Sequence, residues 1–315
     1  MGIFAKIFKK TPILKPNEPK FHKILMFFTK KVEYCKNAFI IKTVKNKARK
    51  RLKSNRNSSK IQGGRMDVQT SIQNRVEWIK KILSQTGAKG IVYGNSGGKD
   101  CTLVGALCKL ATDNVLGVIM PCQSSQNYGS DRDDALRAGK HFGIRQIEID
   151  LTKTKEALLE AFGEQLTLDN AGEANLKMAN VNINPRLRMT TLYALGQARG
   201  YLVAGTGNLD EATLGYFTKW GDGAHDFNPI ADLTVGEIYE HLRALNAPST
   251  IIEKAPSAGL YQGQTDEQEM GIKYSDVDKY LRGEQIPDDV KSKIERAKAR
   301  AGHKLRMPLK FGENV

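Results

Sequence analysis

The most informative segment of this chain reads Gly90-Ile91-Val92-Tyr93-Gly94-Asn95-Ser96-Gly97-Gly98-Lys99-Asp100-Cys101-Thr102-Leu103-Val104. It begins as a short apolar run, is interrupted by a Ser-Gly-Gly turn, and continues with apolar residues at helical spacing. The pattern predicts a strand, a tight loop and a helix. That arrangement directs unpaired backbone N–H groups and the positive end of a helix dipole toward an anion.

The loop residues suit a phosphate group. Gly97 and Gly98 let the backbone approach closely, and we expect both to adopt positive φ angles, where a side chain would clash. Ser96 adds a hydroxyl donor, and Asp100 lies where a phosphate-bound metal would need a ligand. Neither the Walker pattern nor GxGxxG is present, which excludes those two nucleotide loops. Taken alone, the segment could also be an ordinary tight turn.

Composition limits the class of protein. The chain has 315 residues, 40% of them hydrophobic, which is enough for one large domain or two small ones. Its net charge of +15 comes from residues 1–65, which hold 19 Lys/Arg and 2 acidic residues. Residues 66–315 hold 30 basic and 32 acidic residues, so they give no reason to expect a nucleic-acid partner.

Cysteine usage and hydropathy narrow the class further. The four cysteines, Cys35, Cys101, Cys108 and Cys122, show no CxxC spacing and no accompanying His pair, which argues against a zinc site. We therefore expect free thiols and a cytoplasmic protein. No apolar run approaches the roughly 18 residues that a membrane span needs.

We expect residues 1–65 to be a basic leader and residues 66–315 to be the catalytic domain. Three interpretations of the leader stay open: a disordered tail, a start placed upstream of the true one at Met66, or a segment that binds anionic lipid or RNA by charge. The leader lacks the apolar core of a secretory signal, and Lys6 stands where a myristoylation signal needs Ser or Thr.

Helix and strand patterns alternate along residues 66–315. Apolar spacing predicts a first helix from Val68 to the C-cap Gly87, and apolar runs predict strands at 90–94, 115–120, 144–150 and 201–205. Residues 182–185 are expected to break the chain before a helix at 186–199. Thr234 and Glu237 form a capping box before another helix, and a last helix should cover 288–301.

This alternation predicts an α/β fold of three layers, a mostly parallel sheet with helices on both faces, Rossmann-like in type. Ligands of such sheets lie at the carboxyl ends of the strands. The Ser-Gly-Gly loop and the turn Thr206-Gly207-Asn208 both follow predicted strands. We therefore expect them to face one cleft.

Five further stretches are unusually polar or glycine-rich: residues 184–189, 205–211, 215–229, 256–260 and 303–304. Together with the Ser-Gly-Gly loop, their order and spacing resemble ammonia-dependent NAD synthetase over about residues 66–310. The loop itself is similar to the pyrophosphate loop of many ligases that split ATP between its α and β phosphates. The stretches Gly215-Tyr216-Phe217-Thr218-Lys219 and Pro256-Ser257-Ala258-Gly259-Leu260 are more particular to this family.

The resemblance implies an adenine-nucleotide alpha-hydrolase type of fold and a homodimeric carbon–nitrogen ligase that performs the last step of NAD biosynthesis. In that reaction ATP activates the carboxylate of deamido-NAD as an acyl-adenylate, pyrophosphate leaves, and ammonia displaces AMP. Sixty-five Lys-rich residues are too few for the amidase domain of the family's glutamine-dependent versions. We therefore expect free ammonia as the donor, unless a separate glutaminase subunit delivers it.

The resemblance also assigns roles to single residues. It implies that Asp100 and Glu211 bind Mg²⁺, which prefers oxygen ligands. The residues expected to contact ATP are Gly94, Asn95, Ser96, Gly97, Gly98, Lys99, Asp100, Cys101, Thr206 and Ser257. Those expected to contact deamido-NAD are Arg186, Lys219, Asp226, His303 and Lys304. The expected catalytic set is Asp100, Glu211, Lys219 and Asp226, and either Asp222 or Asp226 could take the proton of the incoming ammonium.

Two positions depart from the family pattern. Cys101 stands where Ser is usual and is a weaker hydrogen-bond partner, but we expect activity to survive because backbone donors remain. An ATP-contacting Lys expected near Val235 is absent. Either another cation replaces it, with Lys254 as one option, or ATP binding is weaker.

Other interpretations of these residues remain. Asp100 and Glu211 could simply be acids favoured at helix N-termini. His141, His241, Cys101 and Cys108 fit scaffold positions, and the charges of the last helix fit a solvated face. Loops 122–129 and 254–269 could be lids over the cleft. The competing functions are a tRNA-modifying thiolase and a non-catalytic nucleotide-binding protein.

Overall fold

The computed structural model describes residues 67–123, 128–167, 172–254, 266–308 and 310–312. The chain divides into two compact units, Met1–Gln62 and Gly63–Val315. The first unit lies outside the described residues, as do Ser257 and most of the loop from Lys254 to Glu269.

Four parallel strands form one sheet in the order β3-β2-β1-β4. They are β1 (Gly90–Gly94), β2 (Val115–Ile119), β3 (Arg145–Glu148) and β4 (Tyr201–Val203). The chain builds outward from β1 through β2 to β3, then crosses to the other side of β1 for β4. The strand order therefore switches between β1 and β4, which is where ligands bind in open parallel sheets.

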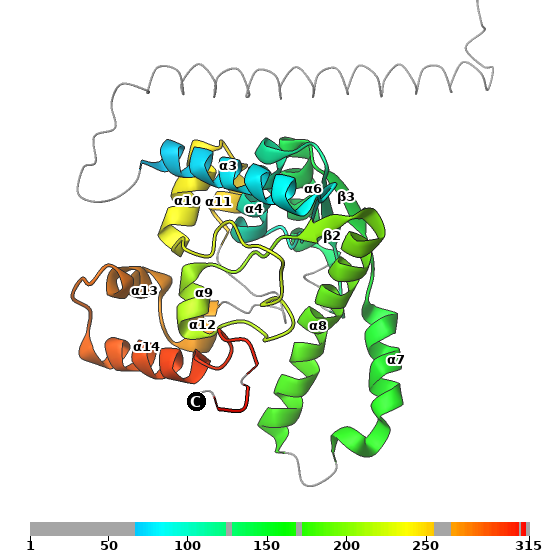
Figure 1. Ribbon diagram of the computed structural model, residues 1–315. Coiled ribbons are helices and arrows are strands. Elements are labelled where there is room, and N and C mark those ends of the chain that lie inside the picture. The colour runs from blue at the N-terminus through cyan, green and yellow to red at the C-terminus, as the bar shows by residue number, and fades with distance from the viewer. Residues whose placement is uncertain (1–66, 124–127, 168–171, 255–265, 309, 313–315) are drawn as a thin grey trace, which may run out of the picture. The chain divides into compact units, whose positions relative to one another are not determined.

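Helices cover both faces of the sheet (Figure 1). Ile91, Tyr93 and Val115 point to one face, where they pack against α3 (Val68–Thr86), α4 (Lys99–Ala111) and α10 (Val235–Ala244). Val92, Leu116 and Val118 point to the other, where α8 (Glu173–Arg199) packs. This alternation follows from the two-residue period of a strand, and it confirms the three-layer α/β prediction.

Further elements lie along the described residues. They are α6 (Ser130–Phe142), α7 (Thr152–Phe162), the 3₁₀ helix η3 (Gly163–Leu166), α9 (Leu209–Leu214), α11 (Ser249–Ile252), α12 (Asp266–Met270), α13 (Tyr274–Leu281) and α14 (Asp288–Ala301). A small separate core joins α9, α13 and α14 through Leu214, Val277 and Ile294. No helix in the described part of the chain is long and apolar enough to cross a membrane.

Most predicted boundaries hold within two or three residues, but the break at residues 182–185 is wrong. Helix α8 continues through Pro185. Proline removes only one hydrogen bond from a helix, and neighbouring polar groups fix this turn from outside. The Thr218 hydroxyl donates to Asn182 Oδ1 at 2.6 Å, and the Cys122 thiol donates to Asn184 Oδ1 at 3.4 Å. The asparagines that suggested a loop are tertiary contacts of a helix.

Candidate active site

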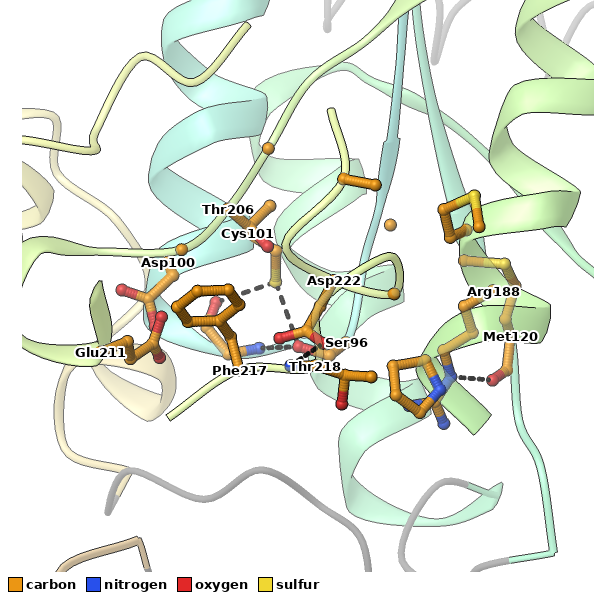
Figure 2. Close-up of a pocket in the computed structure, with 18 of the residues that line it drawn as sticks. Ser96, Asp100, Cys101, Met120, Arg188, Thr206, Glu211, Phe217, Thr218 and Asp222 are labelled. Carbon is orange, nitrogen blue, oxygen red and sulfur yellow. Dashed lines mark hydrogen bonds between the residues drawn. The ribbon is translucent and has the colours of Figure 1, made fainter. Parts of the chain in front are cut away.

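A cavity of about 530 Å³ opens at the carboxyl ends of β1, β2 and β4 (Figure 2). Its lining includes the loop after β1, the turn after β4, the polar face of α8, the segment 215–222 and the C-terminal His303 and Lys304. The prediction that the Ser-Gly-Gly loop and Thr206-Gly207-Asn208 face one cleft is confirmed for Ser96, Gly98, Thr206 and Gly207.

Asn95 shapes the loop from inside the protein. Its side chain is buried, and its amide nitrogen donates to the Ala135 carbonyl and to Gln146 Oε1, both at 3.1 Å. Its Oδ1 accepts the Gly97 N–H at 3.1 Å and the Cys101 thiol at 3.4 Å. Asn95 therefore anchors both ends of the turn, and its side-chain amide holds the conformation of the loop through these bonds.

The two glycines of the loop differ. Gly97 has φ +77°, and a Cβ there would lie 2.3 Å from the Asp131 carbonyl oxygen. Gly98 has φ −82°, so the expectation of a positive φ at Gly98 is wrong. Gly98 is the N-cap of α4, and no side chain caps this helix end. The first N–H groups of α4 thus lie at the cavity wall without a side-chain cap, at the positive end of the helix dipole.

Asp100 and Glu211 come from two helices whose N-termini meet at the cavity, and Figure 2 shows their carboxylates turned toward each other. Asp100 lies in the first turn of α4, and Glu211 is the third residue of α9. Asn208 joins them, since its Nδ2 donates to Asp100 Oδ1 at 3.2 Å and its backbone N–H donates to Glu211 Oε2 at 3.0 Å. Burial and the charge of Asp100 raise the pKa of Glu211.

This carboxylate pair fits a divalent cation with oxygen ligands. Two half-buried carboxylates that repel each other gain from a shared positive charge, and Mg²⁺ needs only one or two of them because it retains water and phosphate ligands. Within the described ranges, no group of three or more His, Cys, Asp or Glu residues could hold a metal.

Four of the residues expected to contact the second substrate line the same cavity: Arg186, Lys219, His303 and Lys304. Lys304 Nζ donates to the Gly215 and Phe217 carbonyls, both at 2.9 Å, and Lys219 Nζ donates to the His303 carbonyl at 2.5 Å. The C-terminal segment and the 215–219 segment therefore hold each other. Desolvation lowers the pKa of Lys304, although Asp222 opposes the shift.

Asp222 and Asp226 occupy different positions. Asp222 lines the cavity, accepts the Thr218 N–H at 2.9 Å, and has a pKa raised by desolvation. Asp226 is not among the residues that line it. Its Oδ2 accepts the Val203 N–H at 2.8 Å, and the Tyr193 hydroxyl donates to its Oδ1 at 3.3 Å. Asp226 thus fastens the end of β4.

Lys254 is engaged by carboxylates of α6. Its ammonium bonds to Asp131 Oδ1 at 2.8 Å and to Asp134 Oδ2 at 2.9 Å, although the residue also lines the cavity.

Val235 and His241 have structural roles in helix α10. The N–H of Val235 donates to Asp210 Oδ2 at 2.6 Å, so this residue fixes the first turn of the helix. The scaffold interpretation is confirmed for His241, which is buried between Ser71 Oγ and the Glu237 carbonyl.

Sequence reasoning missed Arg188. Its Nε donates to the Met120 carbonyl at 3.1 Å, a bond drawn in Figure 2. Burial lowers the pKa of Arg188, and the charge of Asp222 opposes that shift. The residue stands in the polar stretch 184–189, two positions after Arg186. Because a helix advances about 100° per residue, the two side chains leave α8 in different directions, and both still line the cavity.

Comparison with known proteins identifies the family. The family model described as NAD synthase matches residues 71–308. The chain belongs to the NAD synthase family. A curated NH(3)-dependent NAD(+) synthetase from Alkaliphilus oremlandii is 41% identical over 77% of this chain and 96% of its own length. One from Mycoplasmopsis pulmonis is 43% identical over 75% of this chain and 87% of its own length.

Solved structures agree with this family assignment. An NMN synthetase from Francisella tularensis matches with a TM-score of 0.72 and 32% identity, covering 79% of this chain and 100% of the other. An NH3-dependent NAD synthetase from Campylobacter jejuni matches with a TM-score of 0.60 and 30% identity, covering 78% and 100%. The NAD synthase match decides against the thiolase alternative.

Proposed function

We propose that the cavity carries out a two-step amidation of deamido-NAD through an acyl-adenylate, with ATP and ammonia as co-substrates. As an NH3-dependent NAD(+) synthetase, the chain converts deamido-NAD to NAD. The observation that carries the mechanism is the uncapped start of α4 beside the Asp100–Glu211 pair. One feature offers donors to phosphate, and the other offers ligands to the cation that accompanies phosphate.

The first step attaches a leaving group to the carboxylate. A carboxylate oxygen of deamido-NAD attacks the α-phosphorus of ATP, and the bond to pyrophosphate breaks. The Ser96 hydroxyl, the backbone N–H groups at the start of α4 and Thr206 hold the departing phosphates. Asp100 and Glu211 would hold Mg²⁺, which when bound supplies charge neutralisation for the phosphate oxygens. Ser257 would complete the ATP contacts and lies outside the described residues.

The second step replaces AMP. The ammonia nitrogen attacks the acyl carbon, the bond to AMP breaks, and the proton that the nitrogen loses goes to a nearby carboxylate. Asp222 is better placed for that role than Asp226, because it lines the cavity and its raised pKa favours accepting a proton. Arg186, Lys219, His303 and Lys304 would bind the phosphates and carboxylate of deamido-NAD. Asp226 would act on this substrate only indirectly, through β4.

The deciding experiment supplies ATP, Mg²⁺, ammonium and deamido-NAD to the full chain. We expect equal amounts of NAD, AMP and pyrophosphate. Formation of ADP in place of AMP would contradict the acyl-adenylate. Ammonium dependence that is unchanged when both Asp222 and Asp226 are replaced by Asn would remove these residues as proton acceptors.

A mononucleotide substrate is the second candidate, because one structural relative is an NMN synthetase. The two candidates separate when kcat/KM is measured for deamido-NAD and for nicotinic acid mononucleotide. We expect the dinucleotide to be preferred, as the names of the curated relatives indicate.

The assembly and the leader need their own tests. We propose a cytoplasmic homodimer, which sedimentation of the full chain would check. A variant without residues 1–65 should retain its turnover if residues 66–315 are the catalytic domain. Loss of turnover would show that the leader contributes to catalysis.

A further inference from the structure

Lys99 occupies an unfavourable place for a cation. It is the first residue of α4, where the helix dipole disfavours positive charge, and only 7% of it is exposed to solvent. Burial of an ammonium group without a partner is costly. Something specific must therefore hold this side chain where it is.

Lys99 bonds to one carboxylate of the candidate metal site, and the charge of the other acts on it. Its Nζ donates to Asp100 Oδ2 at 2.8 Å. Burial would lower the pKa of Lys99, but the charges of Asp100 and Glu211 together raise it above its ordinary value. The Tyr274 ring, with its centroid 5.6 Å from Nζ, closes the site from α13. Lys99 is thus a fixed positive charge built against the carboxylate pair.

Of the four other lysines that line the cavity, three have acceptors away from the carboxylate pair. Lys254 bonds to Asp131 and Asp134, Lys304 bonds to two backbone carbonyls, and Lys219 bonds to a third. Lys99 differs because its acceptor, Asp100, is also a proposed ligand of the divalent cation. An ammonium and a divalent cation on the same carboxylate oxygens repel each other at short range.

We propose that the Lys99 ammonium competes with the divalent cation for the Asp100–Glu211 pair and so sets the cation concentration at which the site fills. The inference rests on the proposed function, since it takes this pair as the metal site. When the cation binds together with ATP, it displaces the Lys99 ammonium from the carboxylates. Lys99 lines the cavity, so the displaced ammonium stays there and interacts with the phosphates. Without them, the Lys99 ammonium offsets one of the two carboxylate charges, through its bond to Asp100.

The test compares Mg²⁺ binding to the wild-type full chain and to Lys99→Met, which retains length and removes charge. Mg²⁺ alone is titrated by calorimetry at constant ionic strength, and the thermal unfolding midpoint is followed against Mg²⁺ concentration. We expect Lys99→Met to bind Mg²⁺ at least about tenfold more tightly than the wild type, because a nearby repulsive charge is gone. Equal or weaker binding by Lys99→Met would overturn the proposal.

Two variants serve as controls. Lys99→Arg keeps the charge and should keep the wild-type affinity. Lys109→Met removes a lysine from the last turn of the same helix, where it pairs with Asp113 at 3.1 Å, and should leave Mg²⁺ binding unchanged. If Lys99→Met folds only when Mg²⁺ is present, the cation has replaced the ammonium, as proposed. Failure to fold even with Mg²⁺ would contradict the proposal and make Lys99 a structural residue.

A further variant separates this inference from the proposed function. If Asp100→Asn binds Mg²⁺ as the wild type does, the metal site itself is wrong and the inference falls with it. If Asp100→Asn loses Mg²⁺ binding while Lys99→Met remains like the wild type, the metal site stands and only the competition is refuted.

Discussion

Helices α4 and α9 begin at the same cavity, yet their N-termini are completed in opposite ways. At α4 the N-cap is Gly98, and no side chain caps the helix. At α9 the N-cap Asn208 and Glu211 form a full capping box, with each side chain bonded to the other's backbone N–H. An open helix end can bind an external anion, whereas a closed one has already satisfied its donors internally.

The difference shows how one structural element serves two purposes. In the capping box, one carboxylate oxygen of Glu211 accepts the Asn208 N–H, and this bond fixes the Glu211 side chain beside Asp100. In the proposed mechanism, the closed end of α9 holds a carboxylate in place, and the open end of α4 would bind phosphate. If this comparison is right, stability and activity should separate when each end is altered.

The largest effect is expected for Glu211→Gln and Asp100→Asn. Gln also completes a capping box, so α9 should stay closed and the free energy of unfolding should change by about 1 kcal/mol or less. The proposed metal site should be lost, and kcat/KM for NAD formation should fall by about 10²-fold or more. Steady-state kinetics and thermal unfolding of the same preparations measure both. Full activity of Glu211→Gln would mean that Glu211 is only a cap.

The next effect distinguishes the two glycines of the open end. Gly97→Ala forces a side chain into φ +77° and against the Asp131 carbonyl, so unfolding should become easier by about 2–4 kcal/mol. Gly98→Ala has an ordinary φ, and its nearest contact would be Ser96 Oγ at 3.4 Å. It should unfold like the wild type yet bind ATP more weakly, since Gly98 lines the cavity. Denaturant titration measures the stability of the two variants, and calorimetry measures their ATP affinity. Equal loss of stability in both variants would contradict this distinction between the glycines.

A smaller effect is expected at the closed end. Asn208→Ala removes the N-cap of α9 and should cost about 1 kcal/mol of unfolding free energy. Asn208→Ser keeps a capping oxygen and should lose little stability. Both variants lose the Asn208 amide that donates to Asp100, so both should lose about threefold to tenfold in kcat/KM. Wild-type activity in both would show that the Asn208–Asp100 bond does not position the carboxylate.

The order of elements and the loop could be predicted from the sequence because they depend on local patterns. Continuous apolar runs and the alternation of strands with helices predicted the parallel sheet, and the Thr234–Glu237 capping box lies at the start of α10 as predicted. Local rules failed where a distant contact decides. Pro185 looked like a break because the bonds from Thr218 and Cys122 to its asparagine neighbours are invisible in the sequence.

The sequence predicted which segments form the site, but it did not predict which way each side chain in them points. The segment that contains Asp222 and Asp226 was found, but only the fold shows that Asp222 lines the cavity while Asp226 bonds to β4. Lys254 was considered as the cation that Val235 does not provide, and its two aspartate partners on α6 were not foreseeable. Lys99 was seen as a loop residue, and its bond to Asp100 required the geometry of α4.

The smallest effect is expected for Cys101→Ser, in the first turn of α4, three residues after its N-cap Gly98. The Cys101 sulfur lies 3.4 Å from Ser96 Oγ, and its single S–H has two acceptors in reach, Asn95 Oδ1 at 3.4 Å and the Gly98 carbonyl at 3.2 Å. Burial raises its pKa, so it acts as a neutral donor. A hydroxyl finds the same acceptors, and kcat/KM should therefore stay within about threefold of the wild type.

Cys108→Ser is the matched control for that variant, because Cys108 is buried in the apolar cluster under the same helix. It should lose about 1 kcal/mol or more of unfolding free energy without a change in ATP affinity. A tenfold change in the activity of Cys101→Ser would mean that the side chain at this position contacts the phosphates. A small change is the result expected if the backbone N–H groups of the open end bind the phosphates and this side chain does not.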